Sequence, residues 1–333
     1  MTMRSRHVTA PTLFIASLLA VTNAAGQGAS YRHTPSGPVS IVVGSASGSI
    51  EDSVARHLAE RLGRAWGKPV LVEQVTGVGG AIAATRVAKS APDAKTFLVS
   101  NVQTYSIQPY YLKTVPFDPM KELAPVSKLA RIPLVLAVSR ESGIRSVSEL
   151  ILRATQRPGT LTYASFGLGT LPHVVGEQFR QVTGTNIIHV PYKGTAPAVQ
   201  DLTAARVDVA FLPATVAAPL AREGKLQLLG VTGAKPYGEL PDVKVFAQLD
   251  LKQMDGEYWY GLFAPSGMNR RLVEDVSNDV RVSMRSPGPG RDTFLPPGVE
   301  IDTSPPSEFA KFIAGESSKW NAVIKSAVQR KLD

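Results

Sequence analysis

The sequence predicts an α/β fold, because segments with strand character alternate with amphipathic helical segments along most of the chain. Near the N-terminal end, two helical patterns separate the β-branched runs Val39–Val43, Val70–Glu73 and Thr96–Val99. A second alternating series begins at Ile132–Val138 and ends near Thr232. Strands that are joined by helices pair in parallel, so we expect sheets that are mostly parallel and flanked by helices.

Two glycine-rich loops introduce the helices of the first series. Residues 44–48 form a loop of small residues before Ser49-Ile-Glu-Asp52, a capping-box pattern with Asp at its last position. The helix that follows has apolar residues at a spacing of four, at Val54, Leu58 and Leu62. Residues 77–80, Gly-Val-Gly-Gly, follow the second strand and open a helix that runs to Lys89.

The second series contains a unit of strand, tight loop and helix. Ile187–Val190 is a β-branched strand, Pro191–Gly194 cannot continue it, and Thr195 is expected to cap the next helix. Val207–Phe211 returns as a strand, which makes the unit a βαβ crossover in a parallel sheet. Loops that follow such strands are where open α/β sheets bind ligands. The series also includes the strands 161–164 and 226–232 and a helix with the full capping box Ser146–Glu149.

Composition and the N-terminal residues indicate an exported globular protein. The 333 residues are 44% apolar and 19% charged, which is ordinary for a globular chain. Arg4 and Arg6, the apolar run 13–21 and small residues near Ala25 form the pattern of a secretory signal peptide, predicted at 1–25. No Cys is present, which excludes disulfides, thiolate metal sites and cysteine catalysis.

The charge pattern favours a small anionic ligand over nucleic acid. The formal net charge of +9 falls by two to +7 when Arg4 and Arg6 leave with the signal peptide. The remaining Lys and Arg residues are scattered among acids, whereas nucleic-acid binding needs a focused basic stripe. A net positive charge modestly steers anions toward the protein.

Three long motifs carry a resemblance to a known family. They are Tyr-Ala-Ser-Phe-Gly-Leu-Gly-Thr at 163–170, His-Val-Pro-Tyr-Lys-Gly-Thr-Ala-Pro-Ala at 189–198 and Trp-Tyr-Gly-Leu-Phe-Ala-Pro-Ser-Gly at 259–267. In this order they resemble the Bug family, the extracytoplasmic substrate-binding proteins of tripartite tricarboxylate transporters. The resemblance implies a monomeric, non-catalytic periplasmic receptor without a cofactor. Such a receptor binds a small organic carboxylate and delivers it to the membrane permease subunits of the transporter.

The resemblance also implies a two-lobed, periplasmic binding protein-like fold of type II, which closes over its ligand by a hinge motion. We expect lobe 1 to be discontinuous, formed by 31–133 and 233–333, and lobe 2 to be formed by 134–232. The long hydrophobic strands 134–138 and 228–231 are expected to cross between the lobes as the hinge.

The C-terminal part is less regular. Pro and Gly residues in 286–298 predict a loop-rich region, whereas 308–328 has the pattern of a closing amphipathic helix. Trp259 and Tyr260 are expected to pack in the core or at the hinge rather than to stack on a ligand. Asp208 alternates with apolar strand residues and is expected to be structural.

The ligand is expected to lie between loops that follow strands in the two lobes. Backbone N–H groups of such loops can converge on an anion beside a helix N-terminus, although a glycine-rich loop can also be only a tight connection. The motif loops contain no Arg, so backbone N–H groups and hydroxyls are expected to carry the binding, with Lys193 as a minor contributor. The candidate ligand-binding residues are Ser45, Ala46, Ser47, Gly48, Ser49, Gly79, Gly80, Asn101, Ser165, Gly167, Gly169, Thr170, His173, Tyr192, Lys193, Gly194 and Thr195.

The loops depart from the family pattern at positions that bear on the ligand. The family's first loop, usually Pro-Phe-x-x-Gly-Gly, falls on Gly44–Ser49, which lacks the aromatic residue and has a hydroxyl at Ser49. Val75 and Ala81 stand where Arg and Asn are common in the second loop, and Leu212 replaces a usual Asp. The identity of the carboxylate therefore stays open.

Other classes of function remain open from the sequence. An exported hydrolase needs a Gly-x-Ser-x-Gly elbow, and Gly-Ser-Ala-Ser-Gly at 44–48 places its serine one position too late. The segment 77–82 lacks the third glycine of a dinucleotide-binding loop. His173 and His189 lack a third ligand at metal spacing, so we interpret them as packed residues rather than zinc ligands. A sensor subunit that presents its bound metabolite to a signalling partner is the other alternative.

Overall fold

The computed structural model describes residues 31–111, 118–286 and 294–329. The predicted signal peptide, 1–25, and residues 287–293 of the predicted loop-rich segment lie outside these ranges. Among the described residues, no helix is both long and apolar enough to cross a lipid bilayer.

The first sheet contains the three strands that the sequence predicts near its N-terminal end. β1 (Val39–Val43) lies between β2 (Val70–Gln74) and β3 (Thr96–Asn101), and all three run parallel. The sheet continues with antiparallel strands, because β9 pairs with β3, β4 pairs with β9, and β10 pairs with the other side of β4. These strands cover Glu257–Pro265 (β9), Leu123–Ser139 (β4) and Glu300–Ile301 (β10).

The second sheet forms on the other half of β4. β7 (Val209–Pro213) and β8 (Leu226–Val231) pair with β4 from its two sides, both antiparallel. β5 (Thr162–Ser165) runs parallel to β7, and β6 (Ile188–Pro191) runs parallel to β5 at the edge of the sheet. The predicted crossover from β6 to β7 is therefore parallel, but β5 lies between the two strands.

Helices flank both sheets, and both predicted capping-box patterns start helices. Only the hydroxyl half of each box forms, because Asp52 and Glu149 accept from the Gly48 and Arg145 N–H groups and not from those of the N-cap residues. The Ser49 hydroxyl accepts from the Asp52 N–H at 3.2 Å, and the Ser146 hydroxyl accepts from the Glu149 N–H at 3.1 Å. The helices are α1 (Ile50–Trp66), α2 (Ala81–Ala88), α3 (Gln108–Tyr111), α4 (Pro119–Glu122), α5 (Val147–Gln156), α6 (Leu171–Thr183), α7 (Thr195–Thr203), α8 (Ala214–Arg222), α9 (Arg270–Arg285) and α10 (Pro306–Gln329), with short helical turns η1 (Val78–Gly80), η2 (Gln103–Ile107), η3 (Arg140–Ser142) and η4 (Phe246–Leu249).

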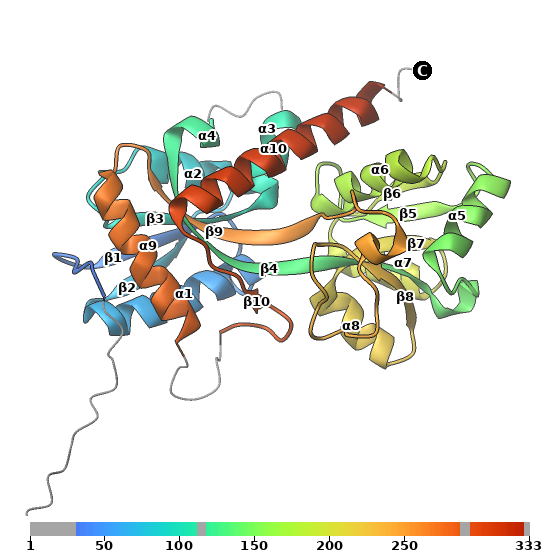
Figure 1. Cartoon of the computed structure of the whole chain (residues 1–333), viewed down its shortest axis with the longest axis horizontal. Helices are drawn as coiled ribbons and strands as arrows, with labels where there is room; N and C mark the ends of the chain where they lie inside the picture. The colour runs from blue at the N-terminus through green and yellow to red at the C-terminus, as the bar shows by residue number, and fades with distance from the viewer. Residues whose placement is uncertain (1–30, 112–117, 287–293, 330–333) are drawn as a thin grey trace, which may run out of the picture. The chain divides into compact units, whose positions relative to one another are not determined.

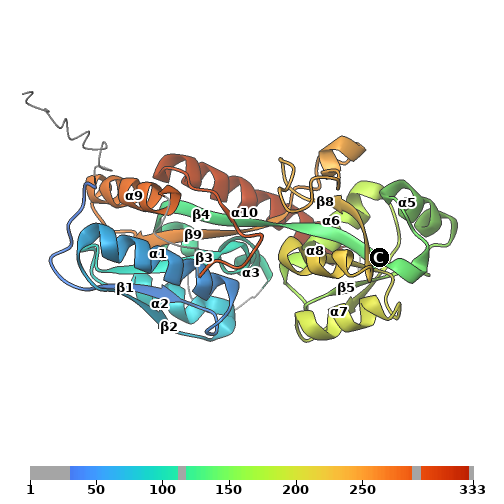
Figure 2. The ribbon, with the colours of Figure 1, turned by 90° about the horizontal axis from the view of Figure 1, so that it is seen from below.

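β4 belongs to both sheets. It pairs with β9 as far as Pro133, and with β7 and β8 from Leu134 onward. Figures 1 and 2 show β4 and β9 running side by side between the two groups of helices. The predicted crossing at 134–138 lies in β4, whereas 228–231 lies in β8 and pairs only within the second sheet. β9 pairs only within the first sheet, and the chain re-enters that sheet at Glu257. We therefore propose that the second crossing lies at the start of β9 rather than at 228–231.

The segment between β8 and β9 packs on the second sheet. The ring of Phe246 lies 6.4 Å from that of Phe211 in β7, measured between centroids. The side chain of Gln178 in α6 donates to the Gln253 carbonyl at 2.7 Å. The predicted boundary after residue 232 places this segment in lobe 1; from these contacts we propose instead that lobe 2 comprises 134–256.

The closing helix α10 and β9 share an aromatic core. Trp259 and Trp320 are fully buried, and their indole N–H groups both donate to the Glu316 carboxylate, at 3.2 and 3.1 Å. Trp259 also packs edge-to-face on Phe309, with ring centroids 5.7 Å apart. The predictions of a core position for Trp259 and of a helix over 308–328 are therefore confirmed.

Charged side chains are buried where β4 pairs with β9. The Glu257 carboxylate accepts from Lys128 and from Arg131, each at 3.1 Å, and these side chains are only 8 to 11% exposed. Asp302 gives Lys128 a second carboxylate at 2.7 Å, and Glu300 gives Arg131 a second one at 2.6 Å. Removing one partner from such a network leaves buried charge without compensation.

We expect Glu257→Ala to lower the free energy of unfolding by about 3 kcal/mol, at the low end for a broken buried ion pair, because each cation keeps one carboxylate. Urea denaturation followed by circular dichroism measures this cost. Glu223→Ala is the control: Glu223 pairs with Lys225 at 2.7 Å where both side chains are more than half exposed. The control should lose less than about 1 kcal/mol of unfolding free energy. Equal losses in Glu257→Ala and Glu223→Ala would show that burial does not strengthen the ion pairs of Glu257.

Candidate ligand-binding site

Loops that follow the strands of the first sheet meet at one edge. β1, β2 and β3 are parallel, so their carboxyl ends lie together. A Cβ placed on Gly44 would lie 2.5 Å from the Cα of Gly80, which shows that the first two loops touch through their backbones. The Thr104 hydroxyl donates to the Gly79 carbonyl at 2.8 Å and ties the second loop to η2.

The carboxylate of Glu51 is buried among donors of the first loop and of β3. It accepts from the Gly44 N–H at 2.9 Å and from the side-chain amide of Asn101, and the N–H and hydroxyl of Ser45 also lower its pKa. Glu51 is only 5% exposed. Burial raises the pKa of Glu51 to about 7, while these hydrogen bonds act in the opposite direction.

Loops of the second sheet are tied together over an aromatic stack. Ser165 Oγ lies 2.7 Å from His189 Nε2, and the Tyr192 N–H donates to the Ser165 carbonyl at 3.0 Å. The His189 ring stacks on those of Tyr163 and His173, with centroid distances of 4.8 and 4.3 Å. These contacts join the loop after β5 to the loop after β6 on a packed base.

Gln103 connects the strand-end loops of the two sheets. Its side-chain oxygen accepts from the Leu171 N–H, at the start of α6, at 3.0 Å and from the Tyr258 hydroxyl at 3.3 Å. The Gln103 N–H in turn donates to the Asn101 side chain at 2.9 Å. These bonds place the end of β3 beside the start of α6, next to the candidate residues Asn101 and Thr170.

Many of the backbone donors that we expected to face the ligand already donate within the protein. Five N–H groups have acceptors in their own loops or helices: Gly48 with Asp52, Ser49 with the Ala46 carbonyl, Gly80 with the Gly77 carbonyl, Gly169 with His173 and Thr170 with the Gly167 carbonyl. Within the described ranges, the N–H groups of Ala46 and Ser47 donate to no protein acceptor, and both residues are exposed. These two N–H groups are the accessible backbone donors of the first loop.

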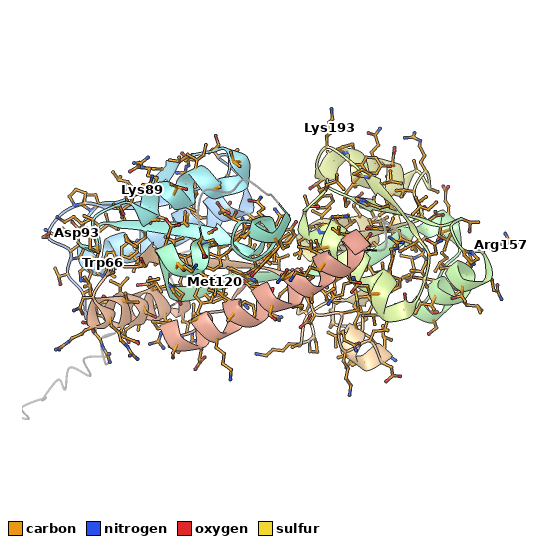
Figure 3. All side chains as sticks on the ribbon, turned by 90° about the horizontal axis from the view of Figure 1, so that it is seen from above. Trp66, Lys89, Asp93, Met120, Arg157 and Lys193 are labelled. Atoms are coloured by element: carbon orange, nitrogen blue, oxygen red, sulfur yellow. The ribbon has the colours of Figure 1, made fainter. Side chains whose placement is uncertain are left out.

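Other candidate side chains in the second lobe shape the loops. The Tyr192 hydroxyl donates to Asp201 at 2.9 Å and holds the loop after β6 against α7. Thr195 is the first residue of α7, so Gly194 rather than Thr195 is the N-cap. Lys193 is exposed, and its side chain points away from the ribbon (Figure 3).

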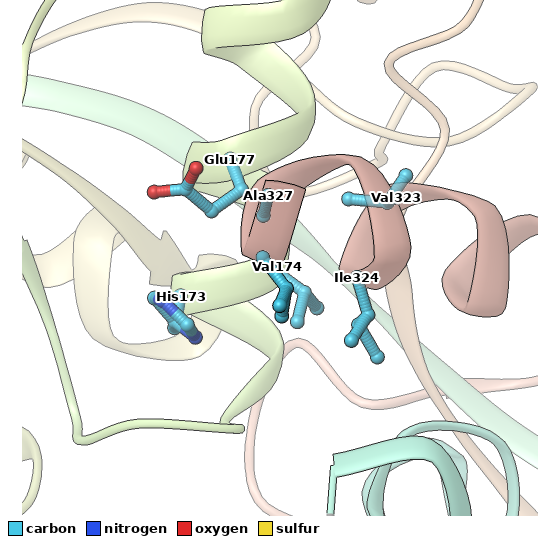
Figure 4. A pocket seen from close by; sticks show the side chains of 7 residues that line it. His173, Val174, Glu177, Val323, Ile324 and Ala327 are labelled. Carbon is cyan, nitrogen blue, oxygen red and sulfur yellow. The ribbon is translucent and has the colours of Figure 1, made fainter. Parts of the chain in front are cut away.

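His173 lies against a small pocket between α6 and α10 (Figure 4). Val174, Val323 and Ile324 make the pocket mostly apolar, and the Gln181 side chain donates to the Val323 carbonyl at 3.0 Å. His173 therefore packs between the loop after β5 and a helix interface. The part of the chain that the structure describes holds no group of three or more His, Cys, Asp or Glu side chains that could bind a metal ion.

Sequence analysis did not identify Glu51 and Gln103 as site residues. Glu51 entered only as an inner position of a capping-box pattern, although a carboxylate in the first helical turn beside a glycine-rich loop was a usable signal. Gln103 follows the last residue of β3, Asn101, by two positions, where a polar side chain also points to a strand-end site.

Two lobes with facing strand-end loops define a protein of the solute-binding class. The chain belongs to the tripartite tricarboxylate transporter family receptors, whose family model matches residues 54–328. Protein BugT of Bordetella pertussis is 29% identical over 294 residues, which cover 87% of this chain and 89% of BugT. The resemblance to the Bug family is therefore confirmed.

Two solved relatives share the fold. Rpa4515 of R. palustris, determined with adipate, is 30% identical, with a TM-score of 0.73 over 88% of this chain and 98% of that chain. MatC from Rhodopseudomonas palustris, with bound malate, is 27% identical, with a TM-score of 0.69 over 87% of this chain and 99% of that chain. These likenesses confirm the predicted periplasmic binding protein-like fold.

Gly44→Ala should push apart the two loops of the first lobe. The new methyl group would overlap the backbone of Gly80, which cannot give way as a side chain can, so we expect a loss of about 1 to 3 kcal/mol of unfolding free energy. Gly37→Ala is the control, because no atom lies within 4 Å of a Cβ placed there. Chemical denaturation compares the two, and equal midpoints would argue against the contact between the loops.

Glu51→Gln should change how stability depends on pH. Because burial raises the pKa of Glu51 from 4.5 to about 7, the folded protein holds a proton that the unfolded chain has lost over this range. Between pH 5 and 8 the unmodified protein should therefore lose about 2 to 3 kcal/mol of unfolding free energy relative to Glu51→Gln. Denaturant titrations at both pH values measure this difference. Parallel pH dependence of the two proteins would show that the pKa of Glu51 is not raised.

Proposed function

We propose that this protein captures a small organic carboxylate between its two lobes and delivers it to the membrane permease of a tripartite tricarboxylate-type transporter. The observation that supports this proposal most directly is the hydrogen bond from the Leu171 N–H, at the start of α6, to the Gln103 side chain, which follows β3. Membership of the receptor family, and relatives determined with adipate and malate, support a carboxylate ligand. The signal-peptide pattern of the sequence supports export to the periplasm.

The ligand is proposed to contact the candidate loops mainly through N–H groups and hydroxyls. An enclosed carboxylate must exchange its hydration shell for several donors, since an unsatisfied buried charge costs several kcal/mol. Ala46 and Ser47 supply accessible N–H groups, whereas the glycines of these loops are proposed to set the loop shape. Lys193 is exposed and is proposed to add only long-range attraction.

A monomeric receptor without a cofactor fits this proposal best, because hinge closure needs both lobes free to move. One observation favours the hydrolase alternative: Ser165 Oγ lies 2.7 Å from His189 Nε2, the arrangement of a nucleophile beside a general base. Ser165 is fully buried, however, and its hydroxyl is engaged with His189 and with the Gly167 backbone. We therefore propose that Ser165 shapes the loop after β5, and that it neither attacks a substrate nor contacts the ligand. The observations therefore favour binding over catalysis at this site.

We expect malate or adipate to raise the melting temperature, by about 2.7 kcal/mol of stabilisation at a hundredfold excess over the dissociation constant. Gln103→Ala removes the hydrogen bond between the lobes and should weaken binding roughly tenfold, as for a net hydrogen bond of about 1 to 1.5 kcal/mol. Lys193→Met, an exposed loop substitution, is the control and should weaken binding less than about threefold. Isothermal titration calorimetry measures these affinities. A small carboxylate panel without any binder would contradict the proposal.

A further inference from the structure

Glu51 places a carboxylate of the protein where the carboxylate of a ligand is expected. The donors that bind it are the Gly44 N–H at 2.9 Å and the Asn101 amide, both in or beside the candidate loops. A bound organic acid would seek the same kinds of donor. The first lobe thus holds its own anion in the donor set at the carboxyl ends of β1 and β3.

Groups that face Glu51 from the neighbouring elements do not neutralise it. Within α1, the adjacent Asp52 is itself an acid, and Arg56 pairs with Asp52 at 2.9 Å. β3 contributes the neutral Asn101. From β9, Tyr260 is buried, and burial raises the pKa of its hydroxyl well above the ordinary value, so it stays neutral as well. Glu51 is therefore held by hydrogen bonds alone.

We propose that Glu51 competes with the ligand for these donors, and that an anionic ligand binds only when Glu51 takes up a proton from the solvent. This inference rests on the proposed binding of a carboxylate. It assigns Glu51 as the residue that makes ligand capture depend on pH.

Repulsion between like charges would link ligand binding to the protonation of Glu51. A second carboxylate within about 4 to 6 Å disfavours the charged form of the first, so a bound dianion favours protonated Glu51. Burial already raises the pKa of Glu51 to about 7, which makes protonation accessible near neutral pH. A hydroxyl can both donate and accept a hydrogen bond, so the Ser45 hydroxyl can accept the proton of the neutral Glu51 acid. The Ser45 hydroxyl can then donate to the Ser49 hydroxyl, whose oxygen lies 2.7 Å away.

Calorimetric titration with malate and with adipate, in buffers of different ionisation enthalpy between pH 6.5 and 8.5, tests the coupling. The unmodified protein should take up close to one proton per ligand at pH 8.5, and its affinity should fall roughly tenfold per pH unit above pH 7. Glu51→Gln should bind without proton uptake and with nearly constant affinity. Glu149→Gln, which alters the exposed first-turn glutamate of α5 that accepts the Arg145 N–H at 2.9 Å, should behave as the unmodified protein. Ligand binding without proton uptake, or the same pH dependence in Glu51→Gln, would overturn the inference.

A second measurement separates this inference from the proposed function. Glu51→Ala removes the carboxylate and leaves its donors in place, so acetate at matched ionic strength should raise the melting temperature of Glu51→Ala. Acetate should not raise it for the unmodified protein or for Glu149→Ala. An unresponsive Glu51→Ala would overturn the inference even if dicarboxylates bind. If acetate stabilises Glu51→Ala while malate and adipate bind no variant, the carboxylate position is supported and the proposed ligand class is wrong.

Discussion

β4 has to satisfy the hydrogen bonds of two sheets along one strand. Every residue from Val126 to Ser139 is buried, so the peptide groups need partners from neighbouring strands rather than from water. β9 and β10 meet this need in the first half, and β7 and β8 meet it in the second. Pro133 lies where β9 gives way to β7, and a residue without an N–H suits the position at which the partner strand changes.

The charged residues of β4 follow from the same constraint. Lys128 and Arg131 lie within a buried strand, and their charges are tolerated because Glu257 of β9 binds both. The ion pairs therefore join the two strands that run between the lobes. Register shifts in the pairing of β4 with β9 lie close to these residues and let the long strand bend without losing its partner.

Most backbone donors of the candidate strand-end loops are already occupied within the protein. Backbone N–H groups of Gly48, Gly80 and Gly169 already donate within their own lobes, which fixes the loop shapes. The Glu51 carboxylate likewise occupies the Gly44 N–H and the Asn101 amide, and it is buried. If the proposed ligand binds here, it must compete with these internal partners, and under our proposal the protonation state of Glu51 then matters more than the exposed cation Lys193.

The sequence by itself determined the alternation of strands and helices, the helix N-caps at Ser49 and Ser146, and the closing helix. Periodicity, caps and turn residues record whether each position is buried and how the local backbone turns, and neither depends on distant partners. Motif order also determined the family, because whole loops were retained together.

Only the tertiary structure decided that β4 is shared, that β9 pairs along its first half, and that the segment before β9 packs on the second sheet. Each depends on which distant strand supplies a hydrogen bond, and a hydrophobic run carries no record of its partner. The same holds for the site: a capping-box glutamate and a glutamine after β3 look ordinary in sequence. They become Glu51 and Gln103 of the candidate site only when folding brings Gly44, Asn101 and Leu171 within hydrogen-bonding distance of them.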